Sequence, residues 1–296
     1  KAFAKAFKIQ YEEQDPFYGR TIIQPSENRF LVQTPPALPL TTKEMDAIYE
    51  LPFQRRWHPD YDAAGGVPAL QEVQFSLTSQ RGCFGHCHFC AITSHQGPII
   101  QSRSHESLLR EAKHMTHLPG FKGYIHDVGG PTANFRHPAC QKQLKAGVCK
   151  NKHCIGSEIC PNLDTSHEDY RKLLKEIRSI PGVKKVFVRS GLRYDYVLAD
   201  HNKKFVEELC QYHVSGQLKV APEHVVKHVT DLMGKADVHA FLKFKDWFDE
   251  ANRKLGKKQY LVPYFMSSHP GCTLDDAIVL AEFLRDMHMQ PEQVQD

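Results

Sequence analysis

Three cysteines lie close together in one short segment, as Cys83-x3-Cys87-x2-Cys90, directly after an apolar-patterned stretch. A four-iron, four-sulfur cluster has four irons, so three thiolates on one loop leave one iron without a protein ligand. Such an open iron can bind and reduce another molecule. Gly82 and Gly85 lie in the same segment, and they allow the tight loop with positive φ angles that three converging thiolates need.

The alternative at this segment is a zinc knuckle, which needs a fourth ligand such as His86, His88 or His95. Zinc loops usually carry two ligands on each of two arms, whereas here three cysteines share one arm. This asymmetry favours the open cluster. The chain has 18 histidines, and any single one is more often an ordinary surface residue than a catalyst. His95 and His269 stay candidates because they lie near the motifs.

A second group of cysteines, Cys140, Cys149, Cys154 and Cys160, lies in a segment rich in Lys and Gly and poor in apolar residues. A segment of this kind would struggle to fold without a metal. Four thiolates suit either structural zinc or a second iron-sulfur cluster, and the irregular spacing favours zinc slightly. Scattered free thiols are the remaining alternative. We expect the other two cysteines of the chain not to be ligands.

From residue 71 onward, short β-rich runs alternate with helical patterns, which predicts an α/β fold. The predicted strands are residues 72–79, 122–128, 183–189, 216–221 and 258–265, and a sixth begins at 293–295. The predicted helices are residues 104–115, 166–180, 202–213, 239–256 and 274–288. Repeated right-handed connections give a parallel sheet that closes fully or partly into a barrel. In such sheets the chemistry lies on loops at the carboxyl ends of the strands.

The pattern Cys-x3-Cys-x-aromatic-Cys, with Phe89 as its aromatic residue, resembles the signature of the radical S-adenosylmethionine (SAM) enzymes. The motifs GGPTAN, SGLRYDY, LKVAPEH and YLVPYFMSSHPG, together with the cysteine-rich insertion, are similar to the YgiQ-type subgroup over about residues 55–296. The resemblance implies a partial (β/α)6 barrel with the insertion after strand two. It also implies a [4Fe-4S] cluster on the three cysteines and reductive cleavage of SAM to a 5'-deoxyadenosyl radical. The substrate stays unidentified.

The resemblance also assigns cofactor-binding roles at the strand ends. An aromatic ring is expected to border adenine, a backbone turn to receive the methionine end of SAM, and polar side chains to hold its ribose or carboxylate. These residues are Phe89, Gly129, Gly130, Pro131, Ser190, Arg193, Lys219 and Glu223. Pro131 stands where many members carry a glutamate, which leaves the contact to the SAM amino group open. Each motif alone is also typical of an ordinary turn or a surface ion pair. Because all of them are expected at the same edge of the sheet, at the carboxyl ends of its strands, together they favour a cofactor site.

The organisation predicts a boundary near residue 65. We expect residues 1–65 to be the end of an N-terminal region with a linker, and residues 66–296 to be the core, with the insertion at 140–165. The N-terminal part should hold the end of a helix, then a strand at 21–31, then a short helix at 42–53 capped by Thr41 or Thr42. We expect the native chain to continue beyond both ends.

The composition of the chain limits the classes of protein to which it can belong. With 296 residues, 41% hydrophobic and 24% charged, the chain can bury a full core. No apolar run approaches the roughly 20 residues that span a bilayer, and no signal peptide opens the chain, so we expect a cytoplasmic protein without a membrane partner. Nine cysteines, most of them in two groups, suit thiolate ligation in a reducing compartment. A net charge of +4 is compatible with a nucleic-acid partner without requiring one.

Two other functions stay open at this point. In the first, the protein is an RNA- or protein-modifying radical SAM enzyme whose flanking regions recruit the macromolecule. In the second, it is a non-catalytic iron-sulfur or zinc protein that senses redox state or scaffolds a partner. The enzyme needs an electron donor such as a flavodoxin or ferredoxin, and the scaffold needs neither that donor nor SAM.

Overall fold

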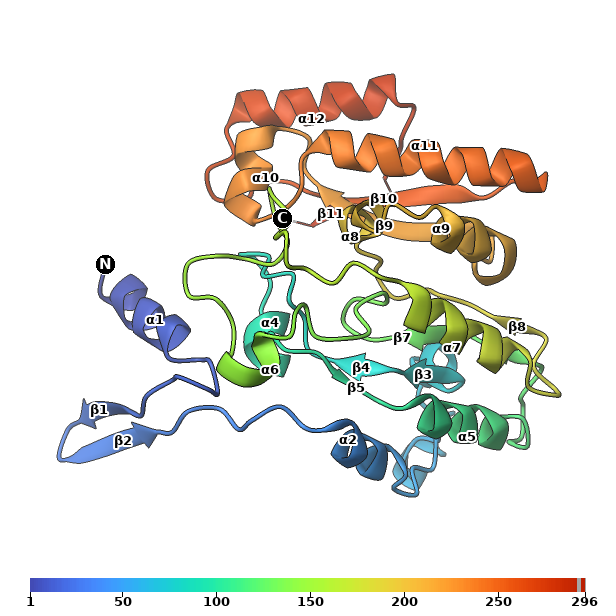
Figure 1. Ribbon diagram of the computed structural model, residues 1–296, viewed down its shortest axis with the longest axis horizontal. Helices are drawn as coiled ribbons and strands as arrows, with labels where there is room; N and C mark the ends of the chain where they lie inside the picture. The colour runs from blue at the N-terminus through green and yellow to red at the C-terminus, as the bar shows by residue number, and fades with distance from the viewer. Residues whose placement is uncertain (292–293, 296) are drawn as a thin grey trace.

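The computed structural model describes residues 1–291 and 294–295. Its N-terminal part holds α1 (Ala2–Glu12), the antiparallel hairpin of β1 (Ile22–Ser26) and β2 (Arg29–Gln33), and α2 (Thr42–Tyr49). In Figure 1, α1 and the hairpin project away from the rest of the chain. The predicted helices of this part are confirmed. The single strand predicted at 21–31 is a hairpin instead, because these residues form all of β1 and the first part of β2.

The cap of α2 is Thr41. Its hydroxyl accepts a hydrogen bond from the amide of Glu44 at 3.3 Å, and the Glu44 carboxylate accepts from the Thr41 amide at 2.8 Å. This reciprocal pair satisfies two backbone donors that the first turn of a helix leaves free. Of the two residues proposed as the cap from the sequence, Thr41 is therefore the one used.

Short strands that pair in parallel make up the centre of the molecule. They are β3 (Ser76–Thr78), β6 (Tyr124–Ile125), β7 (Asp127–Gly129), β8 (Lys185–Val186), β9 (Gln217–Glu223), β10 (Tyr260–Met266) and β11 (Val294–Gln295). Strand β3 pairs with β7, β6 pairs with β8, and β10 pairs with both β9 and β11, each time in parallel. A parallel bridge between Leu192 and Val220 joins the region after β8 to β9. An additional antiparallel pair joins β4 (Gln80–Arg81) to β5 (Gln101–Ser102).

Helices alternate with these strands, as the sequence predicts for an α/β fold. They are η1 (Pro59–Tyr61), α3 (Leu70–Val73), α4 (Ile92–Gln96), α5 (His105–Met115), α6 (Gln143–Ala146), α7 (Glu168–Arg178), α8 (Tyr194–Ala199), α9 (Lys204–Glu208), the π-helical turn η2 (Leu209–His213), α10 (Lys227–Met233), α11 (Val238–Leu255) and α12 (Leu274–Asp286). Figure 1 shows α11 and α12 lying together along one side of the molecule and α5 on the other.

Two helices show why the local sequence folds this way. Helix α5 begins after Ser104, whose side chain accepts from the amide of Ser107, so its predicted cap is confirmed. Helix α11 buries Phe241, Phe244 and Phe248, which recur at the three- to four-residue spacing of one helix face. These two helices therefore follow from capping and periodicity alone.

Some predicted boundaries are wrong. The strand predicted at 72–79 begins only at Ser76, because the residues before it form α3, a short turn of good helix formers after Pro68. The strand predicted at 183–189 shortens to the two residues of β8. The sixth strand is present as β11, parallel to β10, although position 293 of that prediction lies outside the described residues. Helices α8 and α10 were not predicted.

The main core lies between the parallel strands and the helices α5, α7 and α11. Leu77, Ile125, Val128 and Val186 from four strands are at most 2% exposed, so each of these short strands turns one buried side chain into the core. A second apolar group contains Phe84, Phe135 and Tyr196, with Ile100, Ala139, Ile155 and Leu163 around them. We call Phe84, Phe135 and Tyr196 the aromatic cluster. Among the described residues, no helix is both long and apolar enough to cross a membrane.

Candidate cofactor site

The triad loop, residues 82–90, carries the three cysteines between β4 and α4. Its backbone is tied to two neighbouring segments: the Cys83 amide donates to the Gly97 carbonyl at 3.0 Å, and the His88 amide donates to the Met233 carbonyl at 2.9 Å. Phe84, the residue after the first cysteine, is fully buried. The loop is therefore held in place by the protein itself.

The two glycines of the loop have different functions. Gly82 has a φ of +91°, and a Cβ at this position would lie 2.5 Å from the carbonyl oxygen of Ile99, so the predicted left-handed conformation is confirmed here. The same prediction for Gly85 is wrong, because the positive φ in this turn falls on His86. Gly85 is required for close approach instead: a Cβ would lie 2.9 Å from Arg193 Nη1 and 3.3 Å from Cys83 Sγ.

Hydrogen-bond donors surround the thiols of the loop. Arg193 Nη1 lies 3.3 Å from Cys87 Sγ, and the amide of Gly85 lies 3.4 Å from Cys83 Sγ. Burial raises the pKa of the Cys83 thiol, and the Gly85 amide and the Thr132 hydroxyl oppose this rise. Donors of this kind favour the thiolate form, which is the form that binds iron.

The triad loop fits an iron-sulfur cluster by its donor set: three free thiols on one loop, with the Gly85 amide and the Arg193 guanidinium directed at two of the sulfurs. Within the part of the chain that the structure describes, no group of three or more His, Cys, Asp or Glu side chains is arranged to hold a metal ion. Two of the three histidines of the zinc alternative, His86 and His88, are engaged elsewhere. The His86 ring stacks on His153, with centroids 5.0 Å apart, and His88 Nδ1 lies 2.7 Å from the Leu232 carbonyl.

A cavity of about 700 Å³ lies beside the triad loop, within the size range of small-molecule sites. Helix α4, which begins two residues after Cys90, contributes Ile92 and Gln96 to its wall. The full lining is Glu72, Val73, Ser76, Leu77, Thr78, Arg81, Ile92, Gln96, Asp127, Gly129, Gly130, Pro131, Val188, Arg189, Ser190, Ser215, Gln217 and Lys219. Five of the residues predicted to bind cofactor thus meet in one cavity: Gly129, Gly130, Pro131, Ser190 and Lys219.

Close packing explains the glycine pair in this wall. A Cβ on Gly129 would lie 2.6 Å from Ser190 Oγ, and a Cβ on Gly130 would lie 2.6 Å from the carbonyl oxygen of Gln80. Any side chain at these positions would push the end of β7 away from β4 and from the segment after β8. The glycines therefore allow three neighbouring segments to come together at the cavity.

Asp127 organises the same wall and was not singled out from the sequence. Its carboxylate accepts the amides of Arg189 at 2.7 Å and Ser190 at 3.0 Å, and also the Ser190 hydroxyl. This fixes the turn after β8 against the start of β7. The available signal was its position two residues before the glycine pair. Thr78, Arg81, Gln96, Ser215 and Gln217 were also missed, because their motifs carry no recognisable pattern.

Arg193 lies outside this cavity lining, between the triad loop and an acidic partner. Its guanidinium donates two hydrogen bonds of 2.8 Å to Asp195 and points Nη1 at Cys87. Both members of the ion pair are buried. Burial raises the pKa of Asp195, but the Arg193 charge and hydrogen bonds lower it below its ordinary value overall. The pair suggested by the sequence is therefore real, but it is not a surface pair.

The remaining predicted residues take other positions. Glu223 is buried with a φ of +68° and pairs with Lys235 at 3.5 Å. Burial raises the pKa of Glu223 although the Lys235 charge opposes it. The Phe89 ring is 36% exposed and meets the His269 ring edge to face at 6.2 Å. His95 lies on α4 and is exposed.

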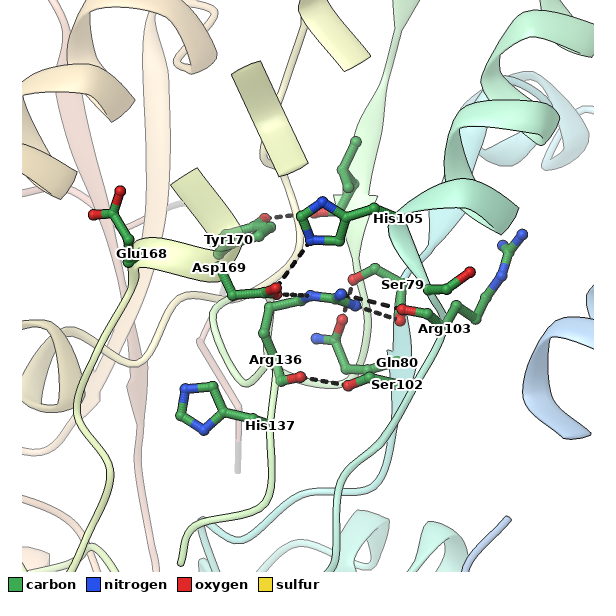
Figure 2. A network of polar contacts seen from close by, with 12 residues as sticks. Ser79, Gln80, Ser102, Arg103, His105, Arg136, His137, Glu168, Asp169 and Tyr170 are labelled. Atoms are coloured by element: carbon green, nitrogen blue, oxygen red, sulfur yellow. Dashed lines mark hydrogen bonds and ion pairs between the residues drawn. The ribbon is translucent and has the colours of Figure 1, made fainter. Parts of the chain in front are cut away.

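A buried polar network contacts the chain just before the triad loop (Figure 2). Arg136 donates to the Ser79 carbonyl at 2.7 Å, to the Arg103 carbonyl at 3.2 Å and to Asp169 at 3.0 Å. His105 Nε2 lies 2.9 Å from the same carboxylate. Burial raises the pKa of Asp169, but the hydrogen bond from His105 and the Arg136 charge lower it to about 2. The network joins β4, α5 and α7 and holds the chain that leads into the triad loop.

The second group of cysteines lines a separate cavity of about 360 Å³. All nine cysteines of the chain are free thiols. Burial, with the nearby thiols of Cys140, Cys160 and Cys149, raises the pKa of Cys154 to about 12. The four thiols predicted as a second metal site are thus neighbours in space. Cys210, in contrast, is buried in the main core beneath α11.

Comparison with known proteins gives two family matches. Residues 1–76 match the model described as Radical SAM N-terminal, and residues 77–284 match the model described as Radical SAM superfamily. UPF0313 proteins of Clostridium perfringens strain SM101 and Clostridium botulinum strain Okra are each 54% identical to this chain over all 296 residues. The matched region is 45% and 46% of those proteins, so the chain spans about half the length of the curated relatives it matches.

The fold is also similar to that of a solved protein. This is the radical S-adenosylmethionine methyltransferase TsrM of Kitasatospora setae, determined with its tryptophan substrate and the SAM analogue aza-SAM. The TM-score is 0.50 at 13% identity, over 99% of this chain and 49% of TsrM. At this identity the likeness concerns the fold alone.

Proposed function

The chain belongs to the radical SAM superfamily, and from this premise we propose that it holds a [4Fe-4S] cluster on Cys83, Cys87 and Cys90 and cleaves SAM reductively. When bound, the reduced cluster supplies the electron that breaks the sulfur to C5' bond of SAM, and the 5'-deoxyadenosyl radical then removes hydrogen from an unidentified substrate.

One observation carries this proposal: the triad loop and the cavity of about 700 Å³ share helix α4 as a common wall. A cofactor in the cavity would lie next to the iron that the three thiolates leave open. The wall formed by Gly129 and Gly130 offers backbone amides and carbonyls at close range. These groups suit the methionine end of SAM.

Two side chains of the cavity are proposed to contact the remaining parts of SAM, its ribose and its carboxylate. Ser190 is oriented by Asp127, to which its hydroxyl donates, so its oxygen stays available as an acceptor for a ribose hydroxyl. Lys219 lines the same cavity and supplies a cation for the SAM carboxylate. We assign this role to Lys219 because the Arg193 guanidinium already donates two hydrogen bonds to Asp195.

Arg193 would act on the cluster instead of on SAM. A buried guanidinium 3.3 Å from Cys87 Sγ stabilises the thiolate and favours the reduced, more negative state of a cluster bound to it. Phe89 keeps its proposed role beside the adenine, and Glu223 keeps its proposed role toward the ribose or carboxylate of SAM. They are proposals from position in the chain and from the family signature.

The architecture proposed for the whole domain follows the family. We propose that the parallel pairs β3–β7, β6–β8 and β9–β10–β11 belong to one partial (β/α)6 barrel, with residues 1–65 as a preceding region, 66–296 as the core and 140–165 as an insertion. A flavodoxin- or ferredoxin-type protein would supply the electron. Nine free thiols suit a reducing compartment, so we propose a cytoplasmic location.

The test is formation of 5'-deoxyadenosine by the full-length protein. The protein is loaded anaerobically with iron and sulfide, reduced with dithionite and mixed with SAM. We expect the nucleoside to form with the wild type and with Cys210→Ala, whose thiol lies in the main core, and to be lost with Cys87→Ala. Absence of the nucleoside from a wild type that carries a full, reducible cluster would contradict the proposal. An RNA- or protein-modifying function stays a prediction until a substrate is found.

A further inference from the structure

The insertion after β7 brings four thiols from separate turns to one cavity of about 360 Å³: Cys140, Cys149, Cys154 and Cys160. Helix α6 lies between the first two, and a backbone hydrogen bond of 3.0 Å from the Cys160 amide to the Cys154 carbonyl joins the last two. The four thiols therefore line one cavity from two parts of the insertion, Cys140 with Cys149 and Cys154 with Cys160.

Polar groups face the sulfurs from within the insertion. Lys142 Nζ lies 3.2 Å from Cys149 Sγ, and Gln143 Nε2 lies 3.7 Å from Cys154 Sγ. Gln143 is 2% exposed, so its amide is committed to this site instead of to water. Donors and a cation beside several thiols lower the cost of keeping them as thiolates.

The walls of this cavity are fixed by contacts with the N-terminal part of the chain. Asp15 is 3% exposed, and its carboxylate accepts the Val148 amide at 2.7 Å. Gly147 has a φ of +69°, and its missing side chain leaves room for that carboxylate. Lys150 lies 4.5 Å from the centre of the Tyr18 ring. The turn between Cys140 and Cys149 is therefore anchored from outside.

The grouping of the thiols bears on which of two metals they hold, because among the described residues no three such side chains are arranged around a single metal ion. A tetrahedral zinc ion lies about 2.3 Å from each sulfur, so its ligands close around a single point. An iron-sulfur cluster contains several irons and sulfides and needs room between its thiolates. From the cavity and the four thiols that line it, we propose that Cys140, Cys149, Cys154 and Cys160 hold a second iron-sulfur cluster. This replaces the slight preference for zinc that the spacing gave.

The second cluster would lie near the first. Cys83 of the triad loop and Cys154 and Cys160 of the insertion all pack against the apolar group that contains the aromatic cluster. Phe84 and Phe135 in this group are stacked with their ring centres 3.7 Å apart. In this position Cys140, Cys149, Cys154 and Cys160 would hold a one-electron carrier between an external one-electron reductant and the triad cluster, and the carrier would return to its oxidised state after each transfer. This role rests on the proposed function, whereas the presence of the cluster does not.

The experiment measures iron, sulfide and zinc in full-length protein prepared anaerobically, with electron paramagnetic resonance (EPR) after reduction by dithionite. One variant replaces Cys83, Cys87 and Cys90 by alanine, and a second replaces the four insertion cysteines by alanine. The matched control replaces Cys210 and Cys272. We expect about eight irons per chain in the wild type and control, and about four in each of the other two.

The triad variant is decisive because its insertion is intact, so a folding failure of the four-cysteine variant does not matter. About four irons and a reduced-cluster signal in the triad variant would support the second cluster. One zinc per chain without iron, or no metal at all, would overturn it. Loss of iron from the four-cysteine variant alone leaves the proposed function untouched. If the clusters are neighbours, the wild-type signal is broader than the sum of the two variants, and an unbroadened sum would overturn the electron-relay role.

Discussion

The triad loop and the cysteine-rich insertion both carry free thiols, but the protein holds them in different ways. The triad loop is tied by backbone hydrogen bonds to Gly97 and Met233 and buries Phe84 completely. The insertion has one short helix, α6, and depends on Asp15 from another part of the chain. The contrast supports the proposal that the fold shapes the triad loop, whereas a bound metal would shape the insertion.

Removing metal should separate the two regions most strongly. Lys142, Lys145, Lys150 and Lys152 in the insertion are exposed and are targets for trypsin once the segment opens. We expect an iron chelator to speed cleavage at these lysines by about tenfold or more, because local opening controls proteolysis. Mass spectrometry of the fragments gives the sites. Equal cleavage with and without chelator would show that the insertion folds without metal.

The ion pair beside the triad loop gives the next effect. Arg193→Leu leaves the Asp195 carboxylate buried without its partner, so we expect the free energy of unfolding to fall by about 3–5 kcal/mol. The double variant Arg193→Leu/Asp195→Leu removes both charges and should recover most of that loss. Urea unfolding of the three proteins makes the measurement. A single variant as stable as the wild type would mean that the pair does not hold this region.

The glycine pair at the cavity should show a smaller effect. A methyl group at Gly130 meets the Gln80 carbonyl oxygen at 2.6 Å, so Gly130→Ala should cost about 1–3 kcal/mol of stability and weaken SAM binding. Gly191→Ala is the control, because no atom lies within 4 Å of the added methyl group. Isothermal titration with SAM and urea unfolding report the two effects. If both variants had the same stability and the same affinity for SAM, Gly130 would have no role in shaping the cavity for SAM.

The smallest effect concerns pH. The hydrogen bond to Asp169, with a further contribution from Glu176, raises the pKa of His105 above 6.5, although burial opposes the rise. Folding therefore favours the protonated ring. Its contribution to stability is complete below pH 6.5 and is lost as the pH rises through the raised pKa. We expect the stability difference between the wild type and His105→Gln to shrink across that range in urea unfolding. A difference independent of pH would contradict this account.

The parts of the fold that follow local rules could be predicted. The cap at Ser104, the cap at Thr41 and the periodic phenylalanines of α11 were all visible in the sequence, because capping and helix periodicity depend on residues a few positions apart. The boundary between α3 and β3 was missed because helix and strand tendencies compete there over a few residues. Tertiary pairing, which the sequence does not display, decides where β3 begins.

The site residues also divide into those that a local sequence pattern reveals and those that only tertiary contacts bring together. The spacing of Cys83, Cys87 and Cys90 is a local pattern, and the family match to the radical SAM superfamily confirms the recognition based on it. The partner of Cys87 is Arg193, 106 positions away, and no local rule connects them. Asp127 likewise acts on Ser190, 63 positions away. The sequence therefore predicted which residues approach the site better than what each of them contacts.

The central claim is that the open iron of the triad cluster lies beside the cavity and binds SAM there. The most direct test is the EPR spectrum of the reduced full-length protein with and without SAM, recorded in the variant that lacks the four insertion cysteines so that one cluster remains. We predict that SAM changes the g values of this cluster, and that Gly130→Ala in the same background weakens the change. A spectrum that SAM leaves unaltered, from a fully loaded and reduced cluster, would contradict the account.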